Sequence, residues 1–599
     1  MDTEKKPKKK HKVLKWTLSI LVVIILFLAA VAWYVNRQWK PLLREAIQNT
    51  ILDASDSLYI VKFKDIKVNI LTGGVEVDSI SITPDLAVYQ RMIDNGSAPE
   101  NIVDLQVQKL ILQRVNPIKV YKERKLTIRD INIQQPSLTI YYTKLGSLAR
   151  KSVDKRTVYE RINKALKELK IATLFLTNVD FRYVDRSFKK PKTTHLDKMN
   201  IRLNDILIDS TSSKDPTRFY NIKDVIAEIS DYDFATPDSM YHLSIKHAYV
   251  SSMKKQLVVN GVSLTPRYGE MVFSKHFERQ EERYQMQFDS IIVNQVNFNT
   301  FLETRTVSAS KVKILNGNLS AFLNRDKPVK NIDKGKNYPH IALKRVAWGI
   351  KSDTVSLKNI NISYTEYNPK TNEKGTVFFN DLKGNIYNVT NDSLALTKSN
   401  ISNAYVQTYL MGKGKLNVHI AFNLTDPNGA FRYNGSLGSM DMSTVNSLTK
   451  PLAMVSISSG KLNSMDFDIK GNLKGAGGTL TLKYEDLNVV LMKKDERENF
   501  KKMGLISLFA NALLLNNSNP RRDKPVVISH PYYARPSEAS FFNLMWKTVF
   551  AGIKESVGVT KEKESKLLKR AKDFKDAKAE REIRREDRQK RRAARKDNK

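Results

Sequence analysis

Most of the chain beyond residue 58 repeats one short pattern of apolar and polar positions. Two apolar residues at alternate positions are followed by a polar two-residue step, and then by two further apolar residues at alternate positions. Side chains alternate between the two faces of a β-strand, so each half of the pattern places its apolar residues on a single face. Clear copies are Val75, Val77, Ile80 and Ile82; Leu126, Ile128, Ile131 and Ile133; Leu174, Leu176, Val179 and Phe181; Ile201, Leu203, Ile206 and Ile208; Leu257, Val259, Val262 and Leu264; and Met286, Phe288, Ile291 and Val293.

The polar steps decide how these strands fold. They include Asp78-Ser79, Arg129-Asp130, Asn204-Asp205, Asn260-Gly261 and Lys358-Asn359. A step of this kind would normally turn the second half of a strand onto the opposite face. A β-bulge restores the phase while it bends the strand, and a tight two-residue hairpin turn is the alternative. Both interpretations predict a mostly antiparallel β protein, and we expect the bulges.

The repetition predicts an elongated sheet, because 599 residues exceed what one compact core usually supports. Val75–Pro84 and Leu257–Pro266 match in residue type at nearly every position, which favours internal duplication. We therefore expect a mostly β fold, an elongated and curved antiparallel β-sheet groove with a few short helices. About 25–30 strands spaced by about 4.8 Å would extend on the order of 120–145 Å. A closed β-sandwich core is the alternative that the pattern leaves open.

One apolar segment near the N-terminus has the length of a membrane span. Residues 16–36 carry no charged side chain, and about 20 helical residues cross the ~30 Å hydrocarbon layer. Seven lysines and two acidic residues precede the segment in residues 1–15, which places the N-terminus in the cytoplasm. A cleaved signal peptide, with Ala30-Val31-Ala32 as its cleavage site, is the alternative. We expect an uncleaved anchor, because the apolar stretch is longer than a usual signal core.

These features divide the chain into five parts. They are a basic cytoplasmic tip at 1–15, a transmembrane anchor at 16–36, an elongated β body at 40–450, a C-terminal β segment with helices at 451–558, and a basic helical or disordered tail at 559–599. Outside the strands, apolar periodicity predicts helices at 158–170, 500–515 and 541–553.

Charge and cysteine content restrict the partners. The net charge is +38 and there is no cysteine, which excludes disulfides and thiolate metal sites. Such a positive charge attracts anions, meaning nucleic acid or acidic lipid head groups. The predicted anchor removes the body from the cytoplasm, so we expect no nucleic-acid partner.

Residues suited to catalysis or metal binding do not fall into recognisable sets. The eight histidines form no His-Glu-x-x-His motif. His242 and His247 lie five apart in a strand pattern, on opposite faces unless a bulge intervenes. The glycines around Lys474 lack the ending of a phosphate-binding loop and fit a turn or bulge. Asp466 and Asp468 fit a solvated strand face. We expect no enzyme activity, no cofactor and no metal.

The combination of parts resembles a known family. The relevant segments are the Leu-x-Ile-x-x-Ile-x-Ile strand at 126–133, Ile457-Ser-Ser-Gly460-Lys-Leu, Gly475-Ala-Gly-Gly and Tyr484-Glu-Asp-Leu487. With the basic tip and single anchor, they resemble the AsmA-like family of bacterial envelope proteins, of the Bacteroidetes type, over roughly residues 13–558. The resemblance implies an inner-membrane anchor, a periplasmic body related to chorein-type lipid-transfer grooves, and a role in phospholipid movement and outer-membrane homeostasis. It implies no catalytic residue, and the basic tail after Lys561 is not part of the family pattern.

These arguments predict a phospholipid conduit that contributes to outer-membrane biogenesis. A lipid that crosses water must shelter its acyl chains, at ~0.8 kcal/mol per methylene. The predicted lining residues are Val75, Val77, Ile80, Ile82, Leu126, Ile128, Ile131, Ile133, Leu174, Leu176, Ile201, Leu203, Ile206, Ile208, Leu257, Val259, Val262 and Leu264. Phospholipid, the inner membrane, and an outer-membrane or periplasmic protein are the expected partners. We expect Ile128→Asp and Ile206→Asp to block transfer more than they lower stability.

Two other functions stay open. A non-enzymatic envelope scaffold or assembly factor would have closed β-sandwich domains with filled cores, and its basic tail would recruit a partner. An envelope hydrolase acting on glycan would need a cleft with paired carboxylates, which the sequence does not reveal.

Overall fold

The computed structural model describes most of the chain between residues 55 and 559. The described residues are 23, 52, 55–69, 74–114, 122–146, 157–163, 166–304, 306–494, 499–502, 515–559, 580 and 584. Among them, no helix combines the length and the apolar composition needed to cross a bilayer. The predicted membrane segment at 16–36 lies outside the described residues except for Val23, as do the basic tip and nearly all of the tail.

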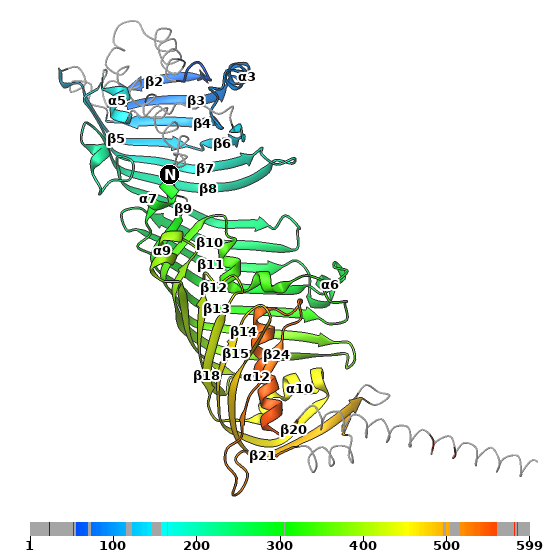
Figure 1. The fold of residues 1–599 in the computed structure, drawn as a ribbon. Helices are drawn as coiled ribbons and strands as arrows, with labels where there is room; N and C mark the ends of the chain where they lie inside the picture. Colours follow the sequence, from blue (N-terminus) through cyan, green and yellow to red (C-terminus); the bar gives the residue numbers. More distant parts are fainter. Residues whose placement is uncertain are drawn as a thin grey trace, which may run out of the picture.

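The fold is mostly β, as the sequence predicts, with 57% strand and 17% helix. The strands are β1 (Tyr59–Lys62), β2 (Asp65–Asn69), β3 (Gly74–Pro84), β4 (Asn101–Gln113), β5 (Lys125–Gln134), β6 (Ser137–Tyr142), β7 (Glu168–Asp185), β8 (Lys192–Ile208), β9 (Ile222–Ala235), β10 (Tyr241–Ser251), β11 (Gln256–Pro266), β12 (Glu282–Asn294), β13 (Thr306–Asn324), β14 (Gly349–Asn368), β15 (Glu373–Thr390), β16 (Ile401–Leu410), β17 (Gly414–Asn423), β18 (Phe431–Leu437), β19 (Met440–Asp441), β20 (Val455–Gly471), β21 (Gly475–Lys494), β22 (Phe500–Lys502), β23 (Ile528–Ser529) and β24 (Tyr532–Ala534). They form one curved, 24-stranded sheet. Figure 1 shows the strands stacked across the long axis of the molecule, nearly in sequence order.

The helices are short and lie in the connections between strands, except for the 16-residue α12, which follows the last strand. They are α3 (Leu86–Asp94), α5 (Val158–Ile162), α6 (Glu270–Lys275), α7 (Phe298–Thr304), α8 (Pro339–Lys344), α9 (Ser393–Lys398), α10 (Asn446–Ala453) and α12 (Phe541–Ser556), with 3-10 turns η2 (Ser212–Lys214), η3 (Lys334–Asn337) and η4 (Met442–Val445). The predicted helix at 541–553 is confirmed as α12.

Two other helix predictions change. The segment 158–170 is helical only to Ile162, and β7 begins at Glu168. Leu169 pairs with Ile208 of β8 and belongs to a strand. Of the predicted helix at 500–515, residues 500–502 form β22, and residues 503–514 lie outside the described residues.

The sheet is mixed, whereas the sequence predicts an antiparallel one. β5 and β6 both run parallel to β7, and β13 runs parallel to β14. Parallel neighbours need a crossover of about a dozen residues or more. Residues 325–348, which include η3 and α8, form that crossover between β13 and β14.

The polar steps lie inside continuous strands, which excludes hairpin turns there. Ser79, Asp205, Gly261 and Asn359 have left-handed backbones, with φ of 54°, 51°, 62° and 55°. At Asn359 the register with β15 shifts, as expected for a β-bulge. At Asp205 and Gly261 the neighbouring strand carries its own step at the same level, so the register is kept. In β3, β5 and β8 the apolar residues before and after the step lie in one core, which confirms a single apolar face across these steps.

The stack is shorter than the sequence predicts. The strands occupy nineteen rows, because β1 with β2, β5 with β6, β18 with β19, and β22 with β23 and β24 lie side by side along a common neighbour. Eighteen spacings of about 4.8 Å amount to on the order of 85 Å.

Candidate functional site

One line of directly paired residues keeps an apolar character across almost the entire sheet. Directly paired residues on neighbouring strands lie on the same face. The line, which we call the apolar row, consists of Val77, Leu110, Ile133, Leu176, Ile201, Ala227, Val250, Leu257, Val293, Val312, Val355, Ile386, Ala404, Ile420, Tyr433 and Ile469. It ends opposite Gly478 on β21. One continuous face therefore runs from β3 to β21.

Burial changes along the apolar row. Its first three members are at most 3% exposed, and Tyr433 and Ile469 near the other end are at most 1% exposed. Every member from Leu176 to Ile386 is only half-buried. The face is thus covered by protein at both ends and incompletely covered between them.

The N-terminal part of the face belongs to a closed core. The predicted lining residues with exposures of 0–8% are Val77, Ile80, Ile82, Leu126, Ile128, Ile131, Ile133, Leu174, Leu203, Ile206 and Ile208. Leu176 and Ile201 are half-buried against this core, and Val75 pairs with Leu112. A lining role for these residues stays a prediction, and it would require this core to open. Substitution of Ile128 or Ile206 by Asp should therefore lower stability at least as much as transfer, contrary to the expectation from sequence.

Short helices and connections cover this N-terminal core. Tyr89 and Met92 of α3 are buried in it, together with Ile162 of α5 and Leu166 before β7. Val23, the one described residue of the predicted anchor, also packs against the core. Other segments of the chain therefore cover the apolar face of β3–β8.

The middle strands carry the same pattern without such a cover. We call the following set the middle face: Leu257, Val259, Val262, Leu264, Met286, Phe288, Ile291, Val293, Val312, Ile314, Leu319, Val355, Leu357 and Ile362. All of them are half-buried, and none belongs to either of the two cores formed by the described residues. Ile360, which pairs with Gly317 on the same face, is buried at 5% exposure and also lies outside both cores. Four members of the middle face are predicted lining residues, namely Leu257, Val259, Val262 and Leu264. The other ten extend the same surface over β12, β13 and β14.

The C-terminal end of the face is closed by α12. Phe467 and Leu480 of the sheet and Phe541 and Leu544 of the helix form one core, each at most 8% exposed. The Tyr433 hydroxyl donates a hydrogen bond to the Met545 carbonyl oxygen at 3.1 Å. Burial raises the pKa of Tyr433 above its ordinary value, so this hydroxyl stays a neutral donor.

The opposite face of the middle strands has a polar ladder. The Asn361 amide donates to Asn318 Oδ1 at 3.2 Å, and the Ser363 hydroxyl donates to Ser320 Oγ at 2.9 Å. Asn318 and Ser320 flank Leu319 of the middle face, and side chains alternate along a strand. The middle of the sheet is therefore amphipathic, with hydrogen-bonded polar rows on one side and half-buried apolar rows on the other.

Two histidines on strands lie beside carboxylates. His195 lies within β8, and its Nε2 is 3.2 Å from Asp180 Oδ1. His242 Nδ1 is 3.5 Å from Asp233 Oδ1. His242 and His247 lie on the same polar face, because the step in β10 intervenes between them. Within the described part of the chain, no three metal-ligating side chains gather into a site.

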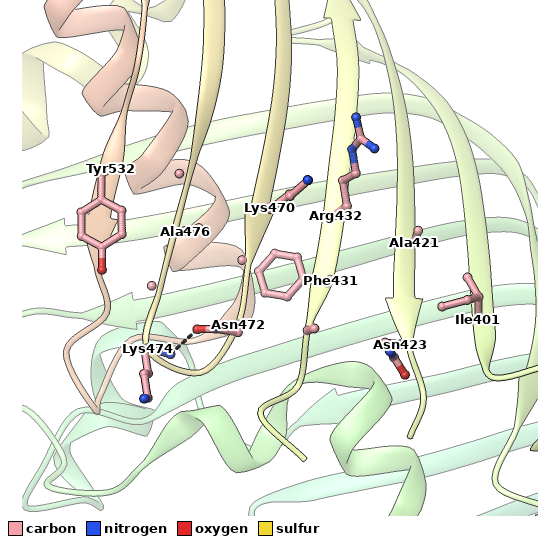
Figure 2. A pocket seen from close by; sticks show the side chains of 14 residues that line it. Ile401, Ala421, Asn423, Phe431, Arg432, Lys470, Asn472, Lys474, Ala476 and Tyr532 are labelled. Atoms are coloured by element: carbon pink, nitrogen blue, oxygen red, sulfur yellow. Dashed lines mark hydrogen bonds between the residues drawn. The ribbon is translucent and has the colours of Figure 1, made fainter. Parts of the chain in front are cut away.

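A shallow depression of about 640 Å³ lies at the ends of β17, β18, β20 and β21. Figure 2 shows its lining, which includes Ile401, Ala421, Asn423, Phe431, Arg432, Lys470, Asn472, Lys474, Ala476 and Tyr532. Arg432 Nε donates to Asp468 Oδ1 at 2.8 Å, and this hydrogen bond holds the pKa of the Asp468 carboxyl below its ordinary value. Lys470 and Lys474 are exposed. The depression is an open cationic surface.

The glycines beside this depression serve close approach of strands and not a turn. Gly475, Gly477 and Gly478 lie within β21. A Cβ atom at Gly478 would lie 2.0 Å from the Asp468 carbonyl oxygen, and one at Gly475 would lie 3.0 Å from Tyr532 Oη. Glycine at these positions lets β20 and β24 pack on β21.

Comparison with known proteins adds no relative: no protein-family model matches the chain, and no curated protein matches it.

Proposed function

We propose that this protein is a lipid conduit of the bacterial envelope, in which the middle face shelters the acyl chains of phospholipid. In this proposal residues 16–36 anchor the chain in the inner membrane, which requires Val23 to leave the N-terminal core on which it packs, and the body lies in the periplasm as a curved groove. The resemblance to AsmA-like proteins and the lysine-rich tip support this placement. The single observation that carries the proposal is the middle face, an apolar surface that belongs to neither protein core.

Incomplete burial of the middle face has a free-energy cost that a guest molecule can remove. Full burial of a large aliphatic side chain stabilises by about 1.5–3 kcal/mol, so the exposed part of each middle-face residue, about a tenth to a third of it, forgoes roughly 0.5 kcal/mol. Over the middle face this amounts to on the order of 7 kcal/mol, which is within the range of the whole stability of a typical domain. Acyl chains supply the apolar atoms that would complete the burial.

A continuous face suits movement better than a single pocket does. The apolar row offers similar side chains on every strand, so a lipid meets no strongly preferred position that it must leave. The head group stays in water, because the middle face is open on one side. Strands β10–β14 would hold the acyl chains of a phospholipid in transit.

Site-specific photo-crosslinking tests the proposal with a matched pair of neighbours. Ile291 and Ile292 are both half-buried on β12, but Ile291 belongs to the middle face and Ile292 faces the other way. A benzophenone amino acid at each position, in the full-length chain in cells, is irradiated, and the purified protein is analysed by mass spectrometry. We expect phospholipid adducts at position 291 and few at position 292.

The same experiment separates the conduit from the alternatives. Equal adducts at both positions, or adducts to protein alone at position 291, would overturn the proposal. The scaffold alternative predicts closed β-sandwich domains, whereas the described strands belong to one sheet, which favours the conduit. Loss of a protein adduct after deletion of residues 561–599 would instead support the scaffold.

A further inference from the structure

The helix α12 has two apolar sides, and the C-terminal core uses only one of them. Leu544 and Val549 on the first side are 0% and 9% exposed. Phe542, Trp546 and Phe550 are spaced by four residues and therefore share another side of the helix. Their exposures are 69%, 47% and 38%. We call these three residues the aromatic stripe.

The aromatic stripe has the composition of a surface that meets lipid at the edge of water. The rings of Trp546 and Phe550 stack with centroids 5.6 Å apart. Lys554 Nζ lies 5.9 Å from the centroid of the Phe550 ring, and Lys547 is exposed beside Trp546. Aromatic rings flanked by lysines are typical of positions at the level of lipid head groups.

The helix lies on the same face of the sheet as the middle face. A second line of directly paired residues connects the two: Ile291, Ile314, Leu357, Gly384, Val406, Val418, Gly435, Phe467 and Leu480. Leu480 packs against α12, since a Cβ atom at Gly552 would lie 3.0 Å from the Leu480 Cβ. In Figure 1, α12 lies over the sheet at its C-terminal end.

The orientation of α12 is held by specific hydrogen bonds. The buried Ser529 hydroxyl lies 2.9 Å from the Gly552 carbonyl oxygen and 2.9 Å from Ser556 Oγ. The bond from Tyr433 to Met545 fixes the middle of the helix. The helix cannot roll to bury the aromatic stripe without breaking these bonds, so the stripe is a fixed surface at the end of the apolar face.

We infer that the aromatic stripe is a second lipid-contact site, where acyl chains arriving along the apolar face leave the middle strands. This inference rests on the proposed conduit and adds the place and the residues of lipid exit. Phospholipid is the occupant because the stripe lies on the helix that closes the end of the apolar face, and its aromatic rings beside lysines suit the level of lipid head groups. The flanking lysines complement its phosphate.

Tryptophan quenching tests the inference directly. The five tryptophans are Trp16, Trp33, Trp39, Trp348 and Trp546. Replacing the first four by Phe in the full-length chain leaves Trp546 as the only reporter. A second variant retains only Trp348, which is 58% exposed and lies outside the aromatic stripe and the middle face. A third has no native tryptophan and carries Phe288→Trp on the middle face.

Each variant is reconstituted in nanodiscs. It is then incubated with vesicles of phosphatidylglycerol whose acyl chains are brominated, and the vesicles are removed by flotation. We expect fluorescence at positions 546 and 288 to be quenched to a similar extent, with little quenching at position 348. The same lipid without bromine is the control and should quench at none of the three.

The outcomes distinguish failure of the exit site from failure of the conduit. Quenching at position 288 without quenching at 546 overturns the exit site and leaves the conduit intact. Quenching at neither overturns both. Equal quenching at 348 and 546, or quenching at 546 that disappears with the vesicles, would mean nonspecific or bilayer contact and would also overturn the inference.

A functional readout follows from the exposure of the stripe. Trp546→Ser combined with Phe550→Ser should reduce lipid transfer between donor and acceptor vesicles several-fold. The thermal midpoint should be unchanged, because neither side chain belongs to the core. Lys547→Ser is the matched control for a change at an exposed helix position, and we expect a smaller effect. Unchanged transfer in the double variant would contradict the exit site.

Discussion

The same substitution at Ile128 and at Ile291 separates protein packing from lipid binding. Both residues project from the continuous apolar face, but Ile128 is 0% exposed in the N-terminal core, whereas Ile291 is half-buried on the middle face. Asparagine is smaller than isoleucine and carries an amide that must hydrogen-bond or remain hydrated. Ile128→Asn should therefore damage the fold, and Ile291→Asn should damage transfer.

The magnitudes follow from the two environments. Ile128→Asn loses about 2–3 kcal/mol of apolar burial and leaves an amide desolvated at about 1–3 kcal/mol, for a destabilisation on the order of 4 kcal/mol. In a unit of about 150–250 residues this lowers the melting temperature by roughly 8–16 °C. Ile291→Asn loses somewhat less burial, because part of Ile291 is already exposed, and its amide reaches water, so we expect about 1–2 kcal/mol.

Both variants are measured in the full-length chain by thermal unfolding and by transfer of fluorescent phospholipid between vesicles. We expect Ile128→Asn to lower the melting temperature strongly. Ile291→Asn should cut transfer several-fold, with a smaller fall in melting temperature of roughly 2–8 °C. Ile292→Asn on the other side of β12 controls for a polar residue in the same strand and should leave transfer near normal. Equal destabilisation by Ile128→Asn and Ile291→Asn would mean that protein fills the middle face, and would refute the reasoning.

Three further predictions concern the fold. Gly384→Ala places a Cβ 2.1 Å from the Tyr405 carbonyl oxygen, so chemical denaturation should show a loss of stability of about 1–3 kcal/mol. Gly438→Ala is the control: its Cβ would lie 3.6 Å from the nearest atom, and the same assay should show almost no change. Burial lowers the pKa of His340. Below about pH 6.5 the imidazole therefore takes up a proton more readily in the unfolded chain than in the folded chain. The free energy of unfolding should fall as the pH drops from about 7.5 to 5.5, and His340→Phe should reduce this pH dependence. Phe467→Ala should cost about 3–5 kcal/mol and raise hydrogen exchange in β18–β21, with β5 and β7 unaffected; equal loss of protection in both regions would count against two separate cores.

Strand positions and the continuous apolar face could be predicted from sequence. Both depend on local properties of the chain, namely the alternation of apolar and polar residues along a strand and the two-residue polar steps. The alternation at 257–264 specifies which side chains share a face, whatever the strand pairs with. Asp85 also signals the start of α3 in the sequence, since its carboxylate accepts hydrogen bonds from the Ala87 and Val88 amides. The sequence prediction missed this helix.

The sequence could not predict which part of the apolar face is covered by other segments of the chain, because the same strand pattern packs against different elements in different places. The pattern at 126–133 is buried by helices from other parts of the chain, and the same pattern at 257–264 is not. The parallel pairing of β13 with β14 depends on residues 325–348, whose polar composition fits a loop as well as a crossover. At 158–170 the apolar residues fit both the helical and the strand period, so periodicity alone could not place the end of α5.

Because the strands lie across the long axis, the backbone hydrogen bonds between them point along it. Tension applied between the two ends of the molecule would therefore peel one strand interface at a time, instead of shearing all the bonds of an interface together. β8 and β9 are 17 and 14 residues long but pair directly only from Asn200 opposite Glu228 to Ile206 opposite Ile222. Two strands with so little of their length paired would separate early under tension, so this seam would act as a compliant joint of the molecule.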